Sequence, residues 1–344
     1  MSIETVIAGI MVGSLIFYAL LGGADYGGGV WDLFARGPRA IRQRELITEA
    51  IGPVWEANHV WLILVIVILF TAFPPAFAAI ATALHVPLTL MLIGIVLRGT
   101  AFTFRTYDVQ HDPVQRRWSL IFSVASVITP LLLGVTLGAI ASGRIRVEND
   151  VVTSGFFRVW LAPFPFAVGL FALALFAFLA AVYLTLETRD RELQDDFRRR
   201  ALISAVAVGL LALTVLLLAK SGAPRVYAGI IRSPWAPGLH LFTGVCATGA
   251  LYSLWTRRYR IARVCAAGQV TLILCGWALA HFPYLVEPDI TISSAAAPRP
   301  TLQLLLVALA AGALLLFPSL YYLFRVFKGR TACTPLGDQS NTEK

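Results

Sequence analysis

Charged residues are scarce in this sequence, and their scarcity excludes an ordinary soluble domain. Only 14% of the 344 residues are Asp, Glu, Lys or Arg, whereas 58% are hydrophobic. Soluble domains contain about 25% charged and about 45–50% apolar residues, so the composition predicts a multi-pass membrane protein. Lys and Arg (28) outnumber Asp and Glu (19), but the arginines lie in short gaps between apolar runs. We therefore attribute the basic balance to membrane topology and expect no nucleic-acid partner.

Cysteine is also rare, with four residues in the chain. Cys246, Cys265 and Cys275 lie in apolar runs, and Cys333 lies near the C-terminus. The sequence has no Cys-x-x-Cys pair and no histidine beside these cysteines, which excludes a zinc-binding pattern and a disulfide framework. We expect the four cysteines to pack as small apolar side chains.

Nine apolar runs are long enough to cross a membrane as helices, since about 20 residues make one crossing. They lie near residues 5–31, 53–73, 76–98, 118–141, 161–187, 201–220, 237–255, 261–282 and 302–325. Lipid cannot satisfy unpaired backbone groups, and the alternation of barrel strands is absent, so we expect an all-α protein. The N-terminus has no positive charge and no cleavage pattern before the first run, so we expect no removable signal peptide. Residues 1–330 are expected to form a single transmembrane domain, and residues 331–344 a disordered tail.

Orientation follows from the basic residues, which concentrate on the cytoplasmic side of membrane proteins. The connections after the odd-numbered runs and the C-terminus, counted with Arg98, Arg263 and Arg325 at the adjoining ends of the runs, contain 21 of the 28 Lys and Arg residues. We therefore expect the N-terminus outside and the C-terminus in the cytoplasm. The most basic connection, residues 189–200, mixes arginines with acids, and we interpret it as a solvated cytoplasmic turn rather than a binding patch.

Polar residues that enter the apolar runs are the candidate functional residues, because ionisable groups inside a membrane are energetically costly. Asp25 lies near the end of the first run, within the glycine-rich segment 22–29. Glu56, Asn58 and His59 lie at the start of the second run. In the predicted orientation Asp25 and Glu56 lie near the cytoplasmic side. We interpret these residues as a path that takes protons from the cytoplasm into the bundle.

Arg98 and Glu187 end the third and fifth runs on the same side, and we expect them to support an inner-end polar cluster. The same spacing permits a simpler interpretation. In that alternative Glu56 only complements the positive end of a helix, and Asp25 only pairs with an arginine to hold helices together. The spacing of the residues leaves both interpretations open.

Metal and haem sites are weaker alternatives. Glu56 and His59 have the Glu-x-x-His spacing of di-iron bundles, but the sequence has no second copy of that pair. His240 and His281 lie near the outer ends of neighbouring runs, where facing haem ligands are geometrically possible, although local hydrogen bonds are the simpler interpretation. His85 lies about ten residues into the third run, near the expected middle of the membrane. We expect no metal and no haem bound directly to this chain.

Four motifs occur in order along the chain: ADYGGG at 24–29, PVWEANHVW at 53–61, RGTAFTFR at 98–105 and FPYL at 282–285. Together they resemble subunit II of the cytochrome bd-type quinol oxidases, and the Trp-acid-x-Asn-x-Val-Trp core is their most specific part. The resemblance implies nine helices, arranged as two four-helix bundles plus one peripheral helix, in the bacterial inner membrane. It also implies a haem-bearing partner, subunit I, which holds two haems b, one haem d and the quinol site.

The resemblance also implies roles for individual residues. Asp25 matches the acid of the first-helix Gly-x-Asp-x-Gly motif and Glu56 the acid of the second-helix motif, both of which are tied to proton delivery. Trp55, Trp61 and Arg105 match further motif positions. The implied reaction of the complex is the oxidation of membrane quinol with reduction of dioxygen to water. Whether a quinone is lodged in this chain, and whether small single-helix subunits join the complex, is left open.

Two other classes of function remain from the sequence. A secondary transporter could use Asp25, Glu56 and His59 as coupling-ion sites, but such sites typically lie near the middle of the membrane and these acids are predicted near its inner side. A purely structural partner subunit could carry the same polar residues without any proton transfer.

Overall fold

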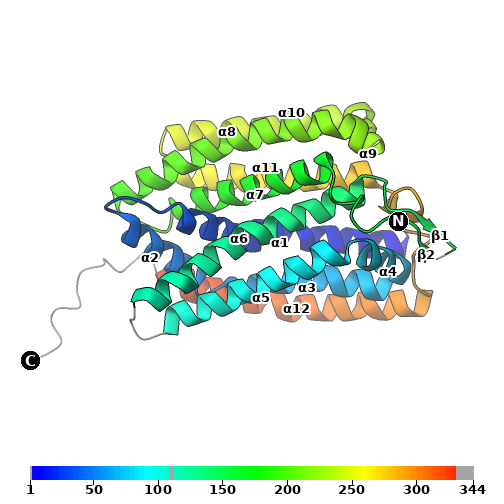
Figure 1. Ribbon diagram of the computed structural model, residues 1–344, viewed down its shortest axis with the longest axis horizontal. Helices are drawn as coiled ribbons and strands as arrows, with labels where there is room; N and C mark the ends of the chain where they lie inside the picture. Colours follow the sequence, from blue (N-terminus) through cyan, green and yellow to red (C-terminus); the bar gives the residue numbers. More distant parts are fainter. Residues whose placement is uncertain (1, 108–111, 150, 331–344) are drawn as a thin grey trace, which may run out of the picture.

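The computed structural model describes residues 2–107, 112–149 and 151–330, and these are mostly helical (Figure 1). Among the described residues, nine helices have 18 residues or more. They are α1 (Ile3–Leu33), α3 (Trp55–Ala72), α5 (His85–Tyr107), α6 (Asp112–Ala141), α7 (Pro163–Leu184), α8 (Arg191–Gly222), α10 (Ala236–Trp255), α11 (Tyr259–His281) and α12 (Arg299–Arg330). Eight of the nine, all except α10, are long and apolar enough to cross a membrane by length and composition.

Shorter elements connect the long helices. They are α2 (Ala40–Ile51), α4 (Pro74–Ala83), α9 (Pro224–Arg232), the antiparallel pair β1 (Val147–Glu148) and β2 (Val151–Val152), and the antiparallel pair β3 (Tyr284–Val286) and β4 (Ile290–Thr291). Both α4 and α9 begin with proline, whose missing N–H costs nothing in the first turn of a helix. The expected runs did not include α2 or α9, because neither is long or apolar enough to be read as a membrane span.

The two ends of the long axis differ in their connections. Figure 1 shows both strand pairs and the N-terminus at one end, and α2 at the other. We call the end with α2 the inner end, which the sequence predicts to face the cytoplasm, and the end with the strand pairs the outer end.

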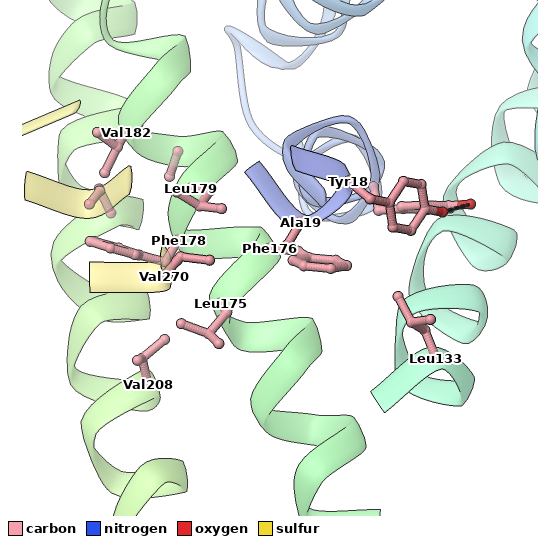
Figure 2. Packing of buried hydrophobic residues seen from close by; sticks show 14 of the residues in the cluster. Tyr18, Ala19, Leu133, Leu175, Phe176, Phe178, Leu179, Val182, Val208 and Val270 are labelled. Atoms are coloured by element: carbon pink, nitrogen blue, oxygen red, sulfur yellow. Dashed lines mark hydrogen bonds between the residues drawn. The ribbon is translucent and has the colours of Figure 1, made fainter. Parts of the chain in front are cut away.

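Helix α1 lies at the centre of the packing and contacts α3, α6 and α7. Figure 2 shows Tyr18 and Ala19 of α1 beside Phe176 of α7, while Leu175, Phe178 and Leu179 of α7 meet residues of α8 and α11. Because lipid tails are as apolar as the side chains, van der Waals packing rather than hydrophobic exclusion holds such helices together. Close packing therefore depends on small residues in α1.

Gly27 is the tightest point of this packing. A Cβ atom added there would overlap the backbone carbonyl oxygen of Phe176 on α7, and one added at Gly29 would overlap the side chain of Ser126 on α6. Without a Cβ, the backbones of neighbouring helices approach closely. The glycines of segment 22–29 therefore set the position of Asp25, which lies among them on the same helix.

A polar network at the inner end joins α2 to the start of α8. Arg39 donates two hydrogen bonds of 2.8 Å to the Asp196 carboxylate, and Gln43 donates a third of 2.7 Å. Arg200 donates a bond of 2.7 Å to the side-chain oxygen of Gln43. The basic connection at 189–200 therefore contains a fixed joint between two helices, and is not simply the solvated turn that we expected.

The expected third run, 76–98, is divided in the structure between α4 and α5. Pro87 has no N–H to donate to the carbonyl of Ala83, and the chain breaks at Leu84. Helix α5 then continues to Tyr107, well beyond the expected end. The expected sixth run is also longer, since α8 begins at Arg191 after Asp190, whose carboxylate caps the helix by accepting a bond from Glu192 N at 2.9 Å.

The remaining expected runs agree with α1, α3, α6, α7, α10, α11 and α12 to within six residues at each end. The expected disordered tail, 331–344, lies outside the described residues.

Candidate functional site

Asp25 is buried in the bundle, with 6% of its surface exposed. Its Oδ2 accepts a hydrogen bond of 2.7 Å from the side-chain amide of Asn58 on α3, which is 2% exposed. The bond therefore ties the carboxylate of α1 to the start of α3 and fixes its orientation.

A cavity of about 70 Å³ opens beside this pair. Asp25 and Asn58 line it together with Tyr183, Glu187 and Arg263 from the inner ends of α7 and α11. A cavity needs only about 10–15 Å³ to hold one water molecule, so this one has room for several. The Oδ1 atom of Asn58 is buried and makes no hydrogen bond with any described residue. A buried amide oxygen in a polar cavity is a natural acceptor for a bound water.

Glu56 lies away from this cavity. Residues 56 and 58 differ by about 200° around a helix of 3.6 residues per turn, and Glu56 is exposed on the opposite side of α3. The structure therefore does not bring Glu56 and Asp25 to one common mouth, although both lie toward the inner end as expected.

His59 lies one turn from Glu56 on α3 and is partly buried. Its ring centroid lies 5.9 Å from that of Tyr18, 6.0 Å from that of Tyr26 and 6.2 Å from that of Trp55. The Tyr18 hydroxyl in turn donates to the Tyr26 hydroxyl at 3.3 Å. His59 thus lies between the buried aromatic cluster and the exposed side of α3.

Arg98 lies deeper than we expected. Because α5 continues to Tyr107, Arg98 precedes the helix end by nine residues, or about 14 Å at 1.5 Å per residue. It is 1% exposed, its Nε donates to Ser126 Oγ at 3.2 Å, and its guanidinium lies 4.7 Å from the Tyr26 ring centroid. Arg98 therefore belongs to the interior of the bundle and not to an inner-end cluster with Glu187.

Asp32 is a buried acid that the sequence reasoning missed. Its carboxylate forms an ion pair of 2.9 Å with Arg105 on α5 and accepts a hydrogen bond of 2.8 Å from Ser123 on α6. Arg105 also donates to Thr48 on α2 at 2.9 Å. One sequence feature could have indicated Asp32: it follows Asp25 by seven residues, which is two turns along the same face of the helix.

The Asp32–Arg105 pair borders the larger cavity of the inner end, which has a volume of about 870 Å³ and lies among α1, α2, α5 and α6. Arg44, Glu45, Glu49 and Arg116 also line it. The family-motif residue Arg105 therefore has a structural role in joining four helices.

The motif tryptophans pack against helices on either side of α3. Trp61 stacks on Phe17 of α1 with ring centroids 4.5 Å apart, and Phe317 of α12 lies 6.0 Å away. Trp55 lies 5.8 Å from Phe102 of α5. Both tryptophans fix the position of α3, which carries Glu56, Asn58 and His59.

The histidines have local contacts. His240 Nε2 lies 2.9 Å from the carbonyl oxygen of Ile230, and His281 lies 3.4 Å from the Glu287 carboxylate. His85 begins α5 and contacts the carbonyl of Thr82 at 2.9 Å, so it lies toward the outer end and not in the middle of a span. Among the described residues, no group of three or more His, Cys, Asp or Glu side chains is arranged to hold a metal. These contacts agree with the interpretation of local hydrogen bonds, and the expectation that this chain binds no haem stays a prediction.

Comparisons with known proteins connect this architecture to one family. Residues 3–327 match the family model described as cytochrome bd terminal oxidase subunit II. The putative cytochrome bd menaquinol oxidase subunit II of Bacillus subtilis (strain 168) is 23% identical over 329 residues, which cover 92% of this chain and 93% of that protein. The cytochrome bd-I ubiquinol oxidase subunit 2 of Escherichia coli (strain K12) is 28% identical over 184 residues, which cover 52% of this chain and 48% of that protein.

A solved structure has the same fold. A chain of the bd oxidase from Geobacillus thermodenitrificans superimposes with a TM-score of 0.80 at 22% identity, and the match covers 95% of this chain and 99% of that chain. The family match extends over almost the whole sequence, and the fold agrees with it. The chain therefore belongs to the cytochrome bd terminal oxidase subunit II family.

Proposed function

We propose that this chain is the non-haem subunit of a bd-type oxidase and that it carries protons from the cytoplasm toward the partner that reduces dioxygen. Membership of the subunit II family makes it part of a cytochrome bd quinol oxidase complex, an oxidoreductase, and implies a subunit I partner. The histidines in the described part of the chain have local contacts. We therefore assign the haem chemistry to subunit I and only proton movement to this chain.

Reduction of dioxygen to water consumes protons, which must reach a site inside the membrane. A relay needs a group that can both take and release a proton. Asp25 has that chemistry, and water in the cavity beside it would supply the protons. Asn58 holds the carboxylate in place, and His59 and Glu56 on the same helix would continue the path to the exposed side of α3.

The observation that carries the proposal is the buried Asp25 carboxylate, held by Asn58 at 2.7 Å and open to a cavity of about 70 Å³. A carboxylate that served only to hold helices together would need an arginine or amide partner but no space for water. A purely structural role is therefore the alternative that the experiment must separate.

The test is Asp25→Asn in the assembled complex. Asn keeps the size of the side chain and most of its hydrogen bonding but cannot relay a proton. We expect the complex to assemble with its haem content intact and the rate of oxygen consumption per haem to fall on the order of 10-fold or more. Oxygen consumption with quinol as donor, normalised to the visible haem absorbance, measures this.

The matched control is Glu148→Gln, which removes an exposed acid at the outer end. It should leave both assembly and turnover unchanged. Full turnover in assembled Asp25→Asn would reject proton transfer by Asp25 and favour the structural role.

A further inference from the structure

The cavity beside Asp25 is built mainly by elements of the inner end that the sequence motifs do not include. Its wall contains Tyr183, near the end of α7, Glu187, three residues beyond that end, and Arg263 in the second turn of α11. Phe324 of α12 also contributes. The cavity therefore lies between α1, α3, α7 and α11, on the opposite side of α3 from Glu56.

Glu187 is held in a turn with a fixed backbone. Its N–H donates to the carbonyl of Leu184 at 3.3 Å. Gln194 at the start of α8 donates to the carbonyls of Thr185 and Thr188 at 3.3 and 2.8 Å, and these residues flank Glu187. The backbone of Glu187 is thus fixed at the border of the cavity, and the residue is partly exposed at the inner end.

Arg263 supplies a positive charge to the same wall. Its guanidinium carbon lies 5.0 Å from the ring centroid of Tyr183, a cation–π distance that fixes the side chain against α7. Two carboxyl groups and one guanidinium therefore share one small cavity. An arginine at such a place compensates the charge of the carboxylates.

Asn58 gives an independent indication that the cavity holds water. Asn58 lines the cavity, and its Nδ2 donates a hydrogen bond to Asp25. Its Oδ1 is buried and makes no hydrogen bond with any described residue. Water bound at Oδ1 would lie beside the Asp25 carboxylate. A continuous series of exchangeable groups then leads from Glu187 through cavity water to Asp25.

We propose that protons enter subunit II between α7 and α11, with Glu187 as the proton-collecting group and Arg263 as a positioning residue, and this inference rests on the proposed role of Asp25. The Glu187 carboxylate takes a proton from hydronium at the inner surface, which leaves a water molecule. It passes that proton through cavity water to the Asp25 carboxylate and returns to its ionised form. No other group is consumed in the step.

The test uses Glu187→Gln, Glu187→Asp and Glu56→Gln in the whole complex, with oxygen consumption normalised to haem content. Glu187→Gln should lower turnover on the order of 10-fold, while Glu187→Asp should restore at least half of it. The solvent deuterium isotope effect on turnover should increase in Glu187→Gln, because proton entry becomes rate-limiting. A residue that only stabilises the turn would change neither the isotope effect nor the rate per haem.

A double variant and two substitutions of Arg263 complete the test. Asp25→Asn with Glu187→Gln should be little slower than the slower single variant, because groups of one path are not additive. Arg263→Lys should keep most of the turnover and Arg263→Gln should lower it, since only the former keeps the charge. Additive losses in the double variant would place Glu187 on a separate path and overturn the inlet.

The outcomes distinguish this inference from the proposed function. Slow turnover in Asp25→Asn with full turnover in Glu187→Gln would overturn the inlet between α7 and α11 and leave the role of Asp25 intact. Glu56→Gln should lower turnover in either case, because Glu56 is proposed to continue the path beyond Asp25. Full turnover in all of these variants would reject both proposals.

Discussion

Asp32 and Arg105 form a buried ion pair, with side-chain exposures of 2% and 12%. Removal of one partner of a buried pair leaves the other charge uncompensated and lowers the free energy of unfolding by about 3–5 kcal/mol. We expect Asp32→Asn to lower the thermal unfolding temperature of the complex and the amount that assembles. Thermal unfolding of purified complex, followed by loss of haem absorbance, measures the change.

A control and a second variant make this prediction specific. Asp195 pairs with Arg257 at 3.2 Å, but both side chains are about half exposed. Asp195→Asn should therefore lower the free energy of unfolding by only about 0–1 kcal/mol. Adding Arg105→Met to Asp32→Asn should recover part of the lost stability, because it removes the uncompensated charge. A double variant less stable than Asp32→Asn would show that Arg105 stabilises through Thr48 rather than through Asp32.

At the level of single residues, the sequence predicted which residues belong to the site more accurately than how those residues are arranged. Asp25 and Asn58 were predicted as members of one site, and they are hydrogen-bonded. Glu56 was predicted beside them because sequence distance to the inner end was the only available measure, and that measure does not show which side of the helix a residue faces. Asp32 and Arg263 were missed because an acid or arginine near a helix end is usually a solvated charge.

At the level of elements, close packing of α1 and α7 at Gly27 is the feature most sensitive to substitution. A methyl group at residue 27 would overlap the carbonyl oxygen of Phe176, which is part of a helix backbone and cannot rotate away. Overpacking of this kind costs about 1–3 kcal/mol and often more. Gly27→Ala should therefore reduce the yield and the thermal stability of the complex.

The same substitution at Gly13 serves as the control, because a Cβ there would meet no atom within 4 Å. Gly13→Ala should be neutral or slightly stabilising, since alanine favours the helix by about 1 kcal/mol. Equal stability of the two variants would show that α1 and α7 can move apart without loss of stability. Turnover per assembled complex should be less affected than yield in Gly27→Ala if the glycine serves packing.

The long helices were predictable from the sequence because each requires a long apolar run, and the run itself is visible. The short helix α2 was not, since only its buried residues Leu46, Ile47 and Ile51 mark it as amphipathic. The division between α4 and α5 depends on Pro87, whose effect was hidden within a continuous apolar run. Boundaries at the inner end, where α5 and α8 extend beyond the apolar segment, depend on polar contacts that the sequence does not reveal.

For the whole molecule, orientation is the prediction on which the path depends. In or beside the connections after odd-numbered runs and at the C-terminus lie 21 of the 28 basic residues, which predicts that this side faces the cytoplasm. A reporter active only in the cytoplasm should therefore function when fused after Lys344 and fail when fused before Met1. The reverse result would put Asp25 and Glu187 near the outer surface and exclude proton uptake from the cytoplasm.

Proton uptake itself tests the central claim most directly. The complex is reduced with quinol, mixed rapidly with dioxygen, and followed with a pH-indicating dye on the cytoplasmic face of vesicles that contain wild-type, Asp25→Asn or Glu148→Gln enzyme. If subunit II supplies the protons, the rate of uptake should fall on the order of 10-fold or more in Asp25→Asn, with the initial reaction of the haems with dioxygen unchanged, and Glu148→Gln should equal the wild type. Uptake at the wild-type rate in Asp25→Asn would contradict the account and move the proton path out of this site.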